Sequence, residues 1–173
     1  MYRIDVLLKE GRQLFHTRDL ALLWGINNQN TLYTTIKRYT RKGILIPIYK
    51  GFYTTVPLDK IDPIHLGITS LSTFTYLSCE YVLSLHGIIF QSSNYITLIS
   101  SVSKKFKLGN YEYIVRKLKD IHLYNDTGIY EEKGLKKATA ERAAADILYF
   151  NPLCHFDNQK ALNLNKLKEI RKE

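Results

Sequence analysis

The side chains with the most evident chemistry in this 173-residue chain lie in one basic stretch, from Asn30 to Phe52, which contains no Asp or Glu. Its cations are Lys37, Arg38, Arg41, Lys42 and Lys50. Residues 1–56 contain nine Lys and Arg against three Asp and Glu, so they carry +6 of the formal net charge of +9. A positive charge concentrated at one end of a chain is typical of a surface that binds phosphate. We therefore expect a nucleic-acid partner.

The spacing within this stretch predicts a helix with two different faces. Leu32, Ile36 and Tyr39 recur at i, i+4 and i+7, which places them on one buried face. The opposite face carries polar and basic side chains that suit base edges and phosphates. The residues that we expect to contact DNA are Asn30, Tyr33, Thr34, Lys37, Arg38, Arg41 and Lys50.

Two further helices are predicted before the basic one. The first has apolar residues at helical spacing and ends at Gly11, and the second has Thr17 as its N-cap and ends at Gly25. The polar residues 27–30 then form a turn. This order of elements is typical of a helix-turn-helix, in which the last helix lies in the major groove of double-stranded DNA.

A β-hairpin is predicted directly after the basic helix, which ends at Gly43. Residues 44–49 and 52–55 form its strands, and Lys50-Gly51 forms the turn. Pro47 lacks an amide donor, so we expect an edge strand or a bulge there. Together with the helices, this hairpin predicts a winged helix-turn-helix whose wing tip contacts the DNA backbone or minor groove.

The fold class predicted for the whole chain is α+β, with the winged helix-turn-helix in residues 1–56 and a mixed domain in residues 64–173. The segment 57–63 has proline at both ends and is predicted as the boundary between them. In the second domain we expect a helix over residues 78–86, whose core face is Leu77, Tyr81 and Leu85. The lysines that we expect in a solvated loop are Lys104, Lys105 and Lys107.

The remaining elements of the second domain are predicted from β-branched runs, turns and helical spacing. The predicted strands cover residues 95–99, 111–118 and 121–124, and a hairpin covers residues 128–135. Thr139 is the predicted N-cap of a helix with Ala143, Ile147 and Phe150 on one face. The tail from Asn158 predicts an amphipathic helix whose apolar residues are Leu162, Leu164 and Leu167.

Motifs for catalysis or metal binding are weak in this sequence. The five histidines and two cysteines lack the spacing of a metal site. Asp126, followed by Glu131, Glu132 and Lys133, loosely matches the carboxylate and lysine pattern of metal-dependent nucleases. We therefore expect no catalytic residue, metal ion or cofactor, and we keep a nuclease with a DNA-binding head as an alternative.

Three segments resemble the AbiEi family of antitoxins. The first is the basic helix with its glycine turn, LYTTIKRYTRKGILIPIYKGFYT. The second, TYLSCEYVLSLHGII, resembles a family helix through Ser78, Leu83, His86 and Gly87. The third, ATAERAAADILYF, resembles another through Ala138, Glu141, Arg142 and Ala143. The resemblance spans about residues 3–155. It includes the order and the spacing of the three segments.

The resemblance implies an autorepressor of a type IV toxin–antitoxin operon for phage abortive infection, with a DNA-binding first domain and an antitoxin second domain. The functional partner would be a nucleotidyltransferase toxin, which such an antitoxin need not bind stably. The resemblance also makes Glu141 and Arg142 candidates for an antitoxin surface. The alternative is a winged-helix transcriptional regulator whose second domain senses a ligand or dimerises.

Composition indicates a globular protein, with 45% hydrophobic and 24% charged residues. The sequence has no leader pattern and no apolar stretch of membrane-spanning length, so we expect a cytoplasmic protein without a membrane partner.

Overall fold

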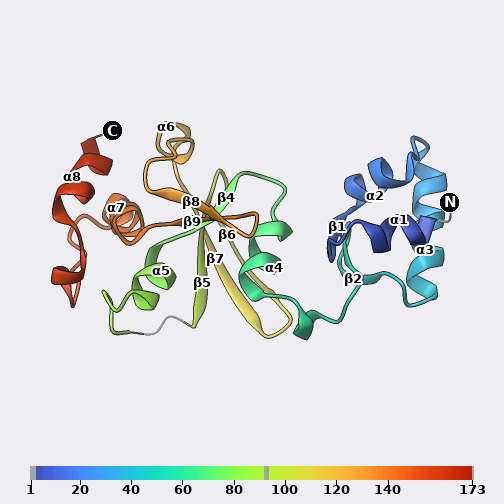
Figure 1. Ribbon diagram of the computed structural model, residues 1–173, viewed down its shortest axis with the longest axis horizontal. Coiled ribbons are helices and arrows are strands. Elements are labelled where there is room, and N and C mark those ends of the chain that lie inside the picture. Colours follow the sequence, from blue (N-terminus) through green and yellow to red (C-terminus); the bar gives the residue numbers. More distant parts are fainter. Residues whose placement is uncertain (1–2, 92–93, 173) are drawn as a thin grey trace. The chain divides into compact units, whose positions relative to one another are not determined.

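The computed structural model describes residues 3–91 and 94–172, which divide into two compact units, residues 1–62 and 63–173. The unit boundary lies at the end of the predicted boundary segment 57–63, so most of that segment belongs to the first unit. Figure 1 shows an α+β arrangement of helices and two separate sheets. No helix in the described part of the chain combines the length and apolar character needed to span a membrane.

The first unit consists of three helices and a small antiparallel sheet in the strand order β1-β3-β2. Its elements are α1 (Arg3–Lys9), β1 (Leu14–His16), α2 (Thr17–Trp24), α3 (Gln29–Arg41), β2 (Ile46–Tyr49), β3 (Phe52–Thr54) and the 3-10 turn η1 (Leu58–Lys60). The sequence pattern missed β1, which is only three residues long. As predicted from Pro47, β2 is an edge strand and its pairing with β3 contains an irregularity between Pro47 and Tyr49.

Apolar side chains from every helix of the first unit meet in one core. Its buried members are Leu7, Phe15, Leu20, Trp24, Ile26, Leu32, Ile36 and Leu45. The Trp24 indole stacks on the Tyr39 ring with centroids 5.3 Å apart, and its Nε1 donates to the Arg3 carbonyl oxygen at 3.2 Å. These contacts fix α3 against α1 and α2 and leave its opposite face in solvent.

The second unit is built on a six-stranded mixed sheet in the order β6-β7-β5-β4-β9-β8. Its strands are β4 (Thr75–Leu77), β5 (Tyr95–Ser100), β6 (Lys104–Leu108), β7 (Tyr111–Lys117), β8 (Ile129–Glu132) and β9 (Leu135–Ala138). Its helical elements are α4 (Pro63–Ser70), α5 (Cys79–Leu85), α6 (Asp120–Leu123), α7 (Ala140–Phe150), α8 (Leu164–Lys172) and the 3-10 turn η2 (Gln159–Ala161). The β5–β7 and β4–β9 pairs are parallel, and the other pairs are antiparallel.

Helices cover both faces of this sheet (Figure 1). On one face, Gly67 of α4 packs so closely on the Tyr113 ring that an added Cβ would lie 2.3 Å from it. On the other face, Arg116 of β7 forms an ion pair with Glu80 of α5 and lies over the Phe150 ring of α7. Because residues 113 and 116 of one strand point to opposite faces, β7 contacts both helical layers.

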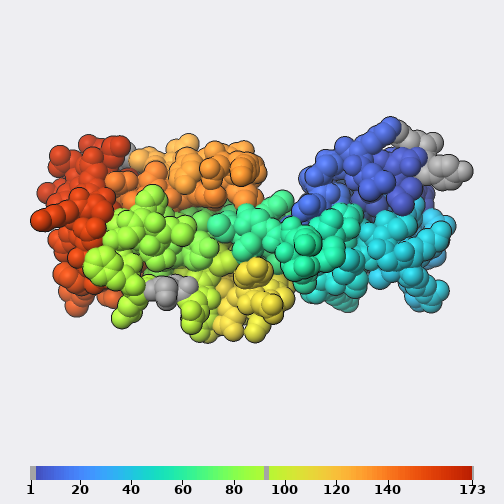
Figure 2. Space-filling model, turned by 60° about the horizontal axis from the view of Figure 1, so that its bottom comes forward, coloured from blue at the N-terminus to red at the C-terminus, as the bar shows by residue number. Residues whose placement is uncertain are grey.

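The chain after α5 and the chain after α7 run side by side in the second unit. The Asn158 amide donates to the Ile88 carbonyl oxygen at 3.1 Å, and the Phe90 amide donates to Asp157 at 2.8 Å. In Figure 2 the corresponding yellow-green and red surfaces are adjacent. These contacts place the C-terminal segment next to α5 and α7 rather than in solvent.

Several expectations for the second unit were wrong. The predicted loop with Lys104, Lys105 and Lys107 is the edge strand β6, and predicted strand 121–124 is mostly the helix α6. Each of these segments is only four or five residues long. Local pattern is weak over that length, and pairing with β7 or burial of Leu123 decides the conformation.

The predicted core face of the helix over residues 78–86 was also wrong. Leu77 belongs to β4, Tyr81 is half-buried, and Leu85 is 67% exposed. The buried residues of α5 are Cys79, Val82 and Leu83. The expectation failed because β4 passes almost directly into α5, and both contribute apolar residues to one continuous run. The first buried residue of the helix is therefore Cys79, two residues after Leu77.

Both helices predicted after residue 138 are present, but the start of the last one differs from the prediction. Thr139 is the N-cap of α7 and accepts a hydrogen bond from the Arg142 amide at 3.3 Å, as predicted. The C-terminal helix begins only at Leu164, so buried Leu162 precedes it, and Leu164 itself is 52% exposed. Leu167 is the buried apolar residue of α8.

Candidate functional site

The exposed face of α3 displays most of the residues predicted to contact DNA. Leu32 and Ile36 are buried, as the helical spacing predicted, and Tyr39 is half-buried against Trp24. On the other side, the exposed residues are Asn30, Tyr33, Thr34, Lys37, Arg38 and Arg41. Asn28 caps the helix by accepting a hydrogen bond from the Thr31 amide at 3.0 Å. The helix therefore presents these side chains on one surface.

The cations of α3, of its C-cap and of the hairpin turn have no neighbouring acid in the described structure. Among the residues that the structure describes, no carboxylate forms an ion pair with Lys37, Arg38, Arg41, Lys42 or Lys50. The Arg38 guanidinium lies over the Tyr39 ring, 5.6 Å from its centroid. A shallow groove on this face is lined by Thr34, Lys37, Arg38, Arg41 and Lys42. Unpaired cations around a groove give a positive field that attracts a polyanion.

The hairpin that carries Lys50 is tied to the start of α2. Gly51 has φ +90°, a left-handed conformation that favours glycine in a tight turn. Its carbonyl oxygen accepts hydrogen bonds from the Thr17 amide at 2.9 Å and from the Thr17 hydroxyl at 3.3 Å. These bonds fix the turn, and with it the backbone that carries exposed Lys50.

The expectation that Thr17 is the N-cap of the second helix was wrong. His16 is the N-cap, and its amide donates to Asp19 Oδ2 at 2.8 Å. Thr17 is the first helical residue and its hydroxyl bonds the hairpin turn instead. The sequence shows only that threonine is favoured near the start of a helix. The partner of its hydroxyl, the Gly51 carbonyl oxygen, is 34 residues away and is determined by the tertiary fold.

The second cluster with unusual chemistry is a buried ion pair in the second unit. Arg142 and Asp146 lie four residues apart on α7 and are 3% and 4% exposed. Arg142 Nε donates to Asp146 Oδ1 at 3.0 Å. Asp146 Oδ2 accepts from the Ser78 hydroxyl at 2.6 Å and from the Tyr76 hydroxyl at 3.0 Å. The pair thus joins α7 to β4 and to the start of α5.

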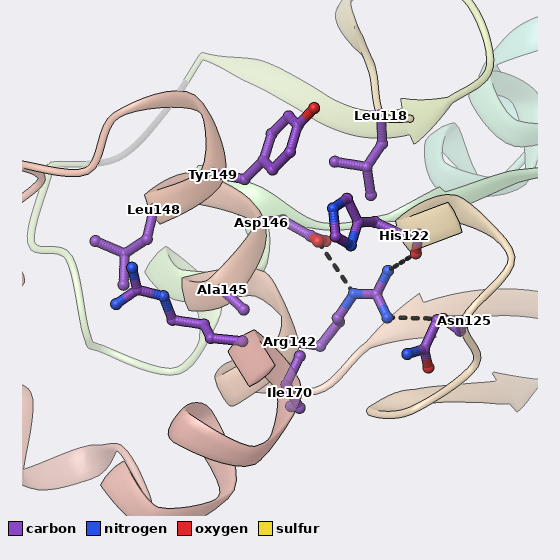
Figure 3. A pocket seen from close by; sticks show the side chains of 10 residues that line it. Leu118, His122, Asn125, Arg142, Ala145, Asp146, Leu148, Tyr149 and Ile170 are labelled. Carbon is purple, nitrogen blue, oxygen red and sulfur yellow. Dashed lines mark hydrogen bonds and ion pairs between the residues drawn. The ribbon is translucent and has the colours of Figure 1, made fainter. Parts of the chain in front are cut away.

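The rest of the Arg142 guanidinium binds carbonyl groups of α6 and of the segment that follows it (Figure 3). Nη1 donates to the carbonyl oxygens of Asn125 and Thr127 at 2.7 and 3.0 Å. Nη2 donates to the carbonyl oxygen of His122 at 2.7 Å and to the Tyr76 hydroxyl at 2.9 Å. These contacts match the fixed fork of five N–H donors of a guanidinium.

The ionisation of this network follows from its burial. Burial lowers the pKa of Arg142, but Asp146 and Tyr76 outweigh that effect and hold it above its usual value. Burial raises the pKa of Tyr76, and the charge of Asp146 raises it further. Arg142 is therefore charged and Tyr76 neutral throughout the physiological pH range, so the Tyr76 hydroxyl can donate to Asp146.

The resemblance makes Glu141 and Arg142 candidates for an antitoxin surface, but Arg142 is buried and does not itself form part of the molecular surface. Glu141 is half-buried, and its Oε1 accepts from the Asn163 amide at 3.3 Å. Thus Glu141 holds the chain before α8, whereas Arg142 points into the unit. The sequence carried one signal for this burial, namely an Arg-Asp pair at i, i+4 on an alanine-rich helix. Nothing local identified Tyr76 as its partner.

Two of the segments that resemble the AbiEi family meet at this network. Ser78 belongs to one motif and Arg142 to the other, and both contact Asp146. The motif residue His86 is exposed at the end of α5. The Ser78 and Arg142 positions therefore serve a shared packing role.

The acidic hairpin residues do not form a cluster in the described structure. Glu131 and Glu132 are exposed on β8, and Glu132 forms an ion pair with Lys137 at 2.6 Å. Within residues 3–91 and 94–172, no group of three or more His, Cys, Asp or Glu side chains could hold a metal ion. Both cysteines are free thiols, and burial raises the pKa of Cys79 well above its usual value.

Comparison with known proteins gives a likeness of fold. No family model and no curated protein sequence matches this chain. It is similar to the crystal structure of the RV2827C protein from Mycobacterium tuberculosis, with a TM-score of 0.58 and 13% sequence identity. The similarity covers 98% of this chain and 69% of that chain. At this identity the likeness concerns the fold alone.

We predict that Gly128→Ala destabilises the second unit more than Gly134→Ala. The two glycines have nearly equal φ, +76° and +75°, so each substitution costs about 1–2 kcal/mol of left-handed strain. A Cβ on Gly128 would also lie 2.8 Å from Arg142 Cβ, whereas Gly134 has open space. Overpacking of this kind adds about 1–3 kcal/mol.

Urea unfolding followed by far-UV circular dichroism measures this difference. The fluorescence of Trp24, the single tryptophan, reports the first unit and should keep its midpoint in both variants. Equal losses for the two substitutions would show that the contact of Gly128 with Arg142 is not important for stability.

Proposed function

We propose that this chain is a DNA-binding transcriptional autorepressor, and that the exposed cationic face of α3 is its recognition surface. The observation that carries the proposal is that Lys37, Arg38 and Arg41 on this face, and Lys42 at the C-cap of the helix, have no acidic partner among the described residues. Its opposite face is fixed in the core. Cations held on a rigid helix bind phosphates without first breaking ion pairs of their own.

The arrangement of the first unit supports a winged helix-turn-helix. Helices α2 and α3 are joined by a short turn, and β2 and β3 form a hairpin directly after α3. In such a protein α3 enters the major groove, where Lys37 and Arg41 reach guanine edges or phosphates and Asn30 pairs with adenine. Lys50, at the hairpin turn, contacts the DNA backbone or the minor groove.

We further propose that the second unit is the antitoxin domain of a type IV toxin–antitoxin operon. The resemblance to the AbiEi family supports this role, and so does the meeting of its Ser78 and Arg142 motifs at one buried ion pair. The functional partner is then a nucleotidyltransferase toxin, which the antitoxin opposes without the need for a stable complex. A nucleotidyltransferase gene next to this one would separate this role from that of a plain regulator.

We predict that Lys37→Ala/Arg41→Ala weakens binding to the DNA upstream of its own gene. Each lost base contact costs about 1–3 kcal/mol. The fold should be retained, because both side chains are exposed and lie opposite Leu32 and Ile36. A gel-shift titration at fixed salt measures the change.

A matched control is Lys9→Ala/Lys60→Ala, which removes two exposed cations outside α3. This control should bind nearly as tightly as the parent. If both double variants lost the same affinity, the effect would reflect net charge, and α3 would not be the recognition helix.

We predict that Lys50→Ala makes DNA binding less dependent on salt. One lost phosphate contact lowers the slope of log K against log salt by about 0.9. Gly51→Val should produce a similar change, because a β-branched residue at φ +90° distorts the turn. Filter binding across a salt series gives the slope of log K against log salt. If both variants kept the slope of the parent, the hairpin would not contact DNA.

We predict that repression and toxin neutralisation are separable in the full-length chain. Lys37→Ala/Arg41→Ala should lose repression of a promoter reporter and still relieve growth arrest by the co-expressed toxin. Arg142→Ala should do the reverse, because it leaves Asp146 as a buried charge without its counter-ion. Loss of neutralisation in the α3 variant would contradict this division of roles.

A further inference from the structure

A pocket of about 240 Å³ lies against the buried ion pair, between the segment after β7, α7 and α8. Arg142 and Asp146 form part of its wall (Figure 3). His122 and Tyr149 line it together, their rings in an edge contact with centroids 5.5 Å apart. Arg171 of α8 also lines it. No residue of the pocket belongs to the first unit, so this site is separate from the proposed DNA surface.

The polar groups that line this pocket differ in whether they are already paired. Arg142 and Asp146 neutralise each other and are bonded to the network described above. Arg171, by contrast, is exposed and makes no ion pair or hydrogen bond with the described residues. The Tyr149 hydroxyl and the His122 ring nitrogens likewise have no hydrogen-bond partner in that part of the chain. As far as the structure describes the chain, the pocket thus retains the positive charge of Arg171 without an acidic partner.

The other walls are apolar and the volume is small. Leu118, Ala145, Leu148 and Ile170 line the pocket beside the polar groups. Ligand pockets usually enclose about 300–1,000 Å³, so this one suits a ligand of a single ring or a short chain. Its apolar walls favour a hydrocarbon body, and Arg171 favours a negative group, which a guanidinium can bind through two parallel hydrogen bonds.

We propose that this pocket binds a small organic anion, a carboxylate or phosphate monoester on an apolar or aromatic body. The anionic group pairs with Arg171, and the body packs on the apolar side chains of Leu148 and Ile170. The bound molecule would lie between α7 and α8. This site gives the second unit a ligand input beyond DNA binding and the antitoxin role.

Isothermal titration of the full-length protein with phenyl phosphate, benzoate and neutral benzyl alcohol tests the proposal. We expect at least one of the two anions to bind and the alcohol to bind at least about tenfold more weakly, because it lacks the charge-assisted bond to Arg171. A preference between phenyl phosphate and benzoate identifies the anionic group. Equal binding of all three compounds, or binding of none at millimolar concentration, would overturn the proposal.

Two variants and one control assign the binding to this pocket. Arg171→Gln should weaken anion binding about tenfold or more, whereas Lys166→Gln, which removes an exposed charge of α8 outside the pocket, should leave it unchanged. Ala145→Leu should weaken binding by filling the pocket without a change in charge. Thermal unfolding checks that each variant is folded. Parental binding in both Arg171→Gln and Ala145→Leu would show that the anion binds elsewhere.

Discussion

The second unit depends on one buried ion pair, between Arg142 and Asp146. Removing two charges from water is costly, and the pair is stable only where further hydrogen bonds satisfy both groups. Here Tyr76 and Ser78 complete the carboxylate, and three backbone carbonyl groups complete the guanidinium. These partners come from β4, from the start of α5, from α6 and from the segment after it. One pair of charges therefore fixes the position of α7 relative to the sheet and to the loop at residues 125–127.

The backbone around the pair is shaped to fit it. Gly128 has φ +76° and lies so close to Arg142 that a Cβ would be only 2.8 Å from the Arg142 Cβ. Cys79, at the β4–α5 junction, has φ +59°, an unfavourable conformation for a residue with a side chain. That sharp junction follows directly on Ser78, whose hydroxyl contacts Asp146. Backbone strain of about 1–3 kcal/mol at such a position persists only when the surrounding contacts determine it.

The two units use charge in opposite ways. In the second unit Arg142 is buried, and its hydrogen bonds are made within the unit, so it cannot contact another molecule. In the first unit the cations of α3 are in solvent, and the fold contributes the rigidity beneath them through Leu32, Ile36 and the Trp24–Tyr39 stack. This contrast supports a binding role for the first surface and an architectural role for Arg142. The pocket beside Arg142 combines both features, because Arg171 has no ion pair among the described residues while Arg142 and Asp146 are held in the network.

The sequence by itself determined the elements that have a strong local period. The alternation of buried and exposed residues on α3, the hairpin turn at Gly51, the edge position of Pro47 and the Thr139 cap all follow from contacts within a few residues. Tertiary structure decided what depends on distant partners. Pairing with β7 makes the lysine segment 104–107 an edge strand, and packing buries Val82 and Leu83 of α5 while Leu85 stays exposed. The Thr17 hydroxyl bonds the hairpin turn and does not cap its helix. Above all, the tertiary structure decided that Arg142 is buried, because its partners Tyr76 and Asn125 lie 66 and 17 residues away and no local pattern records them.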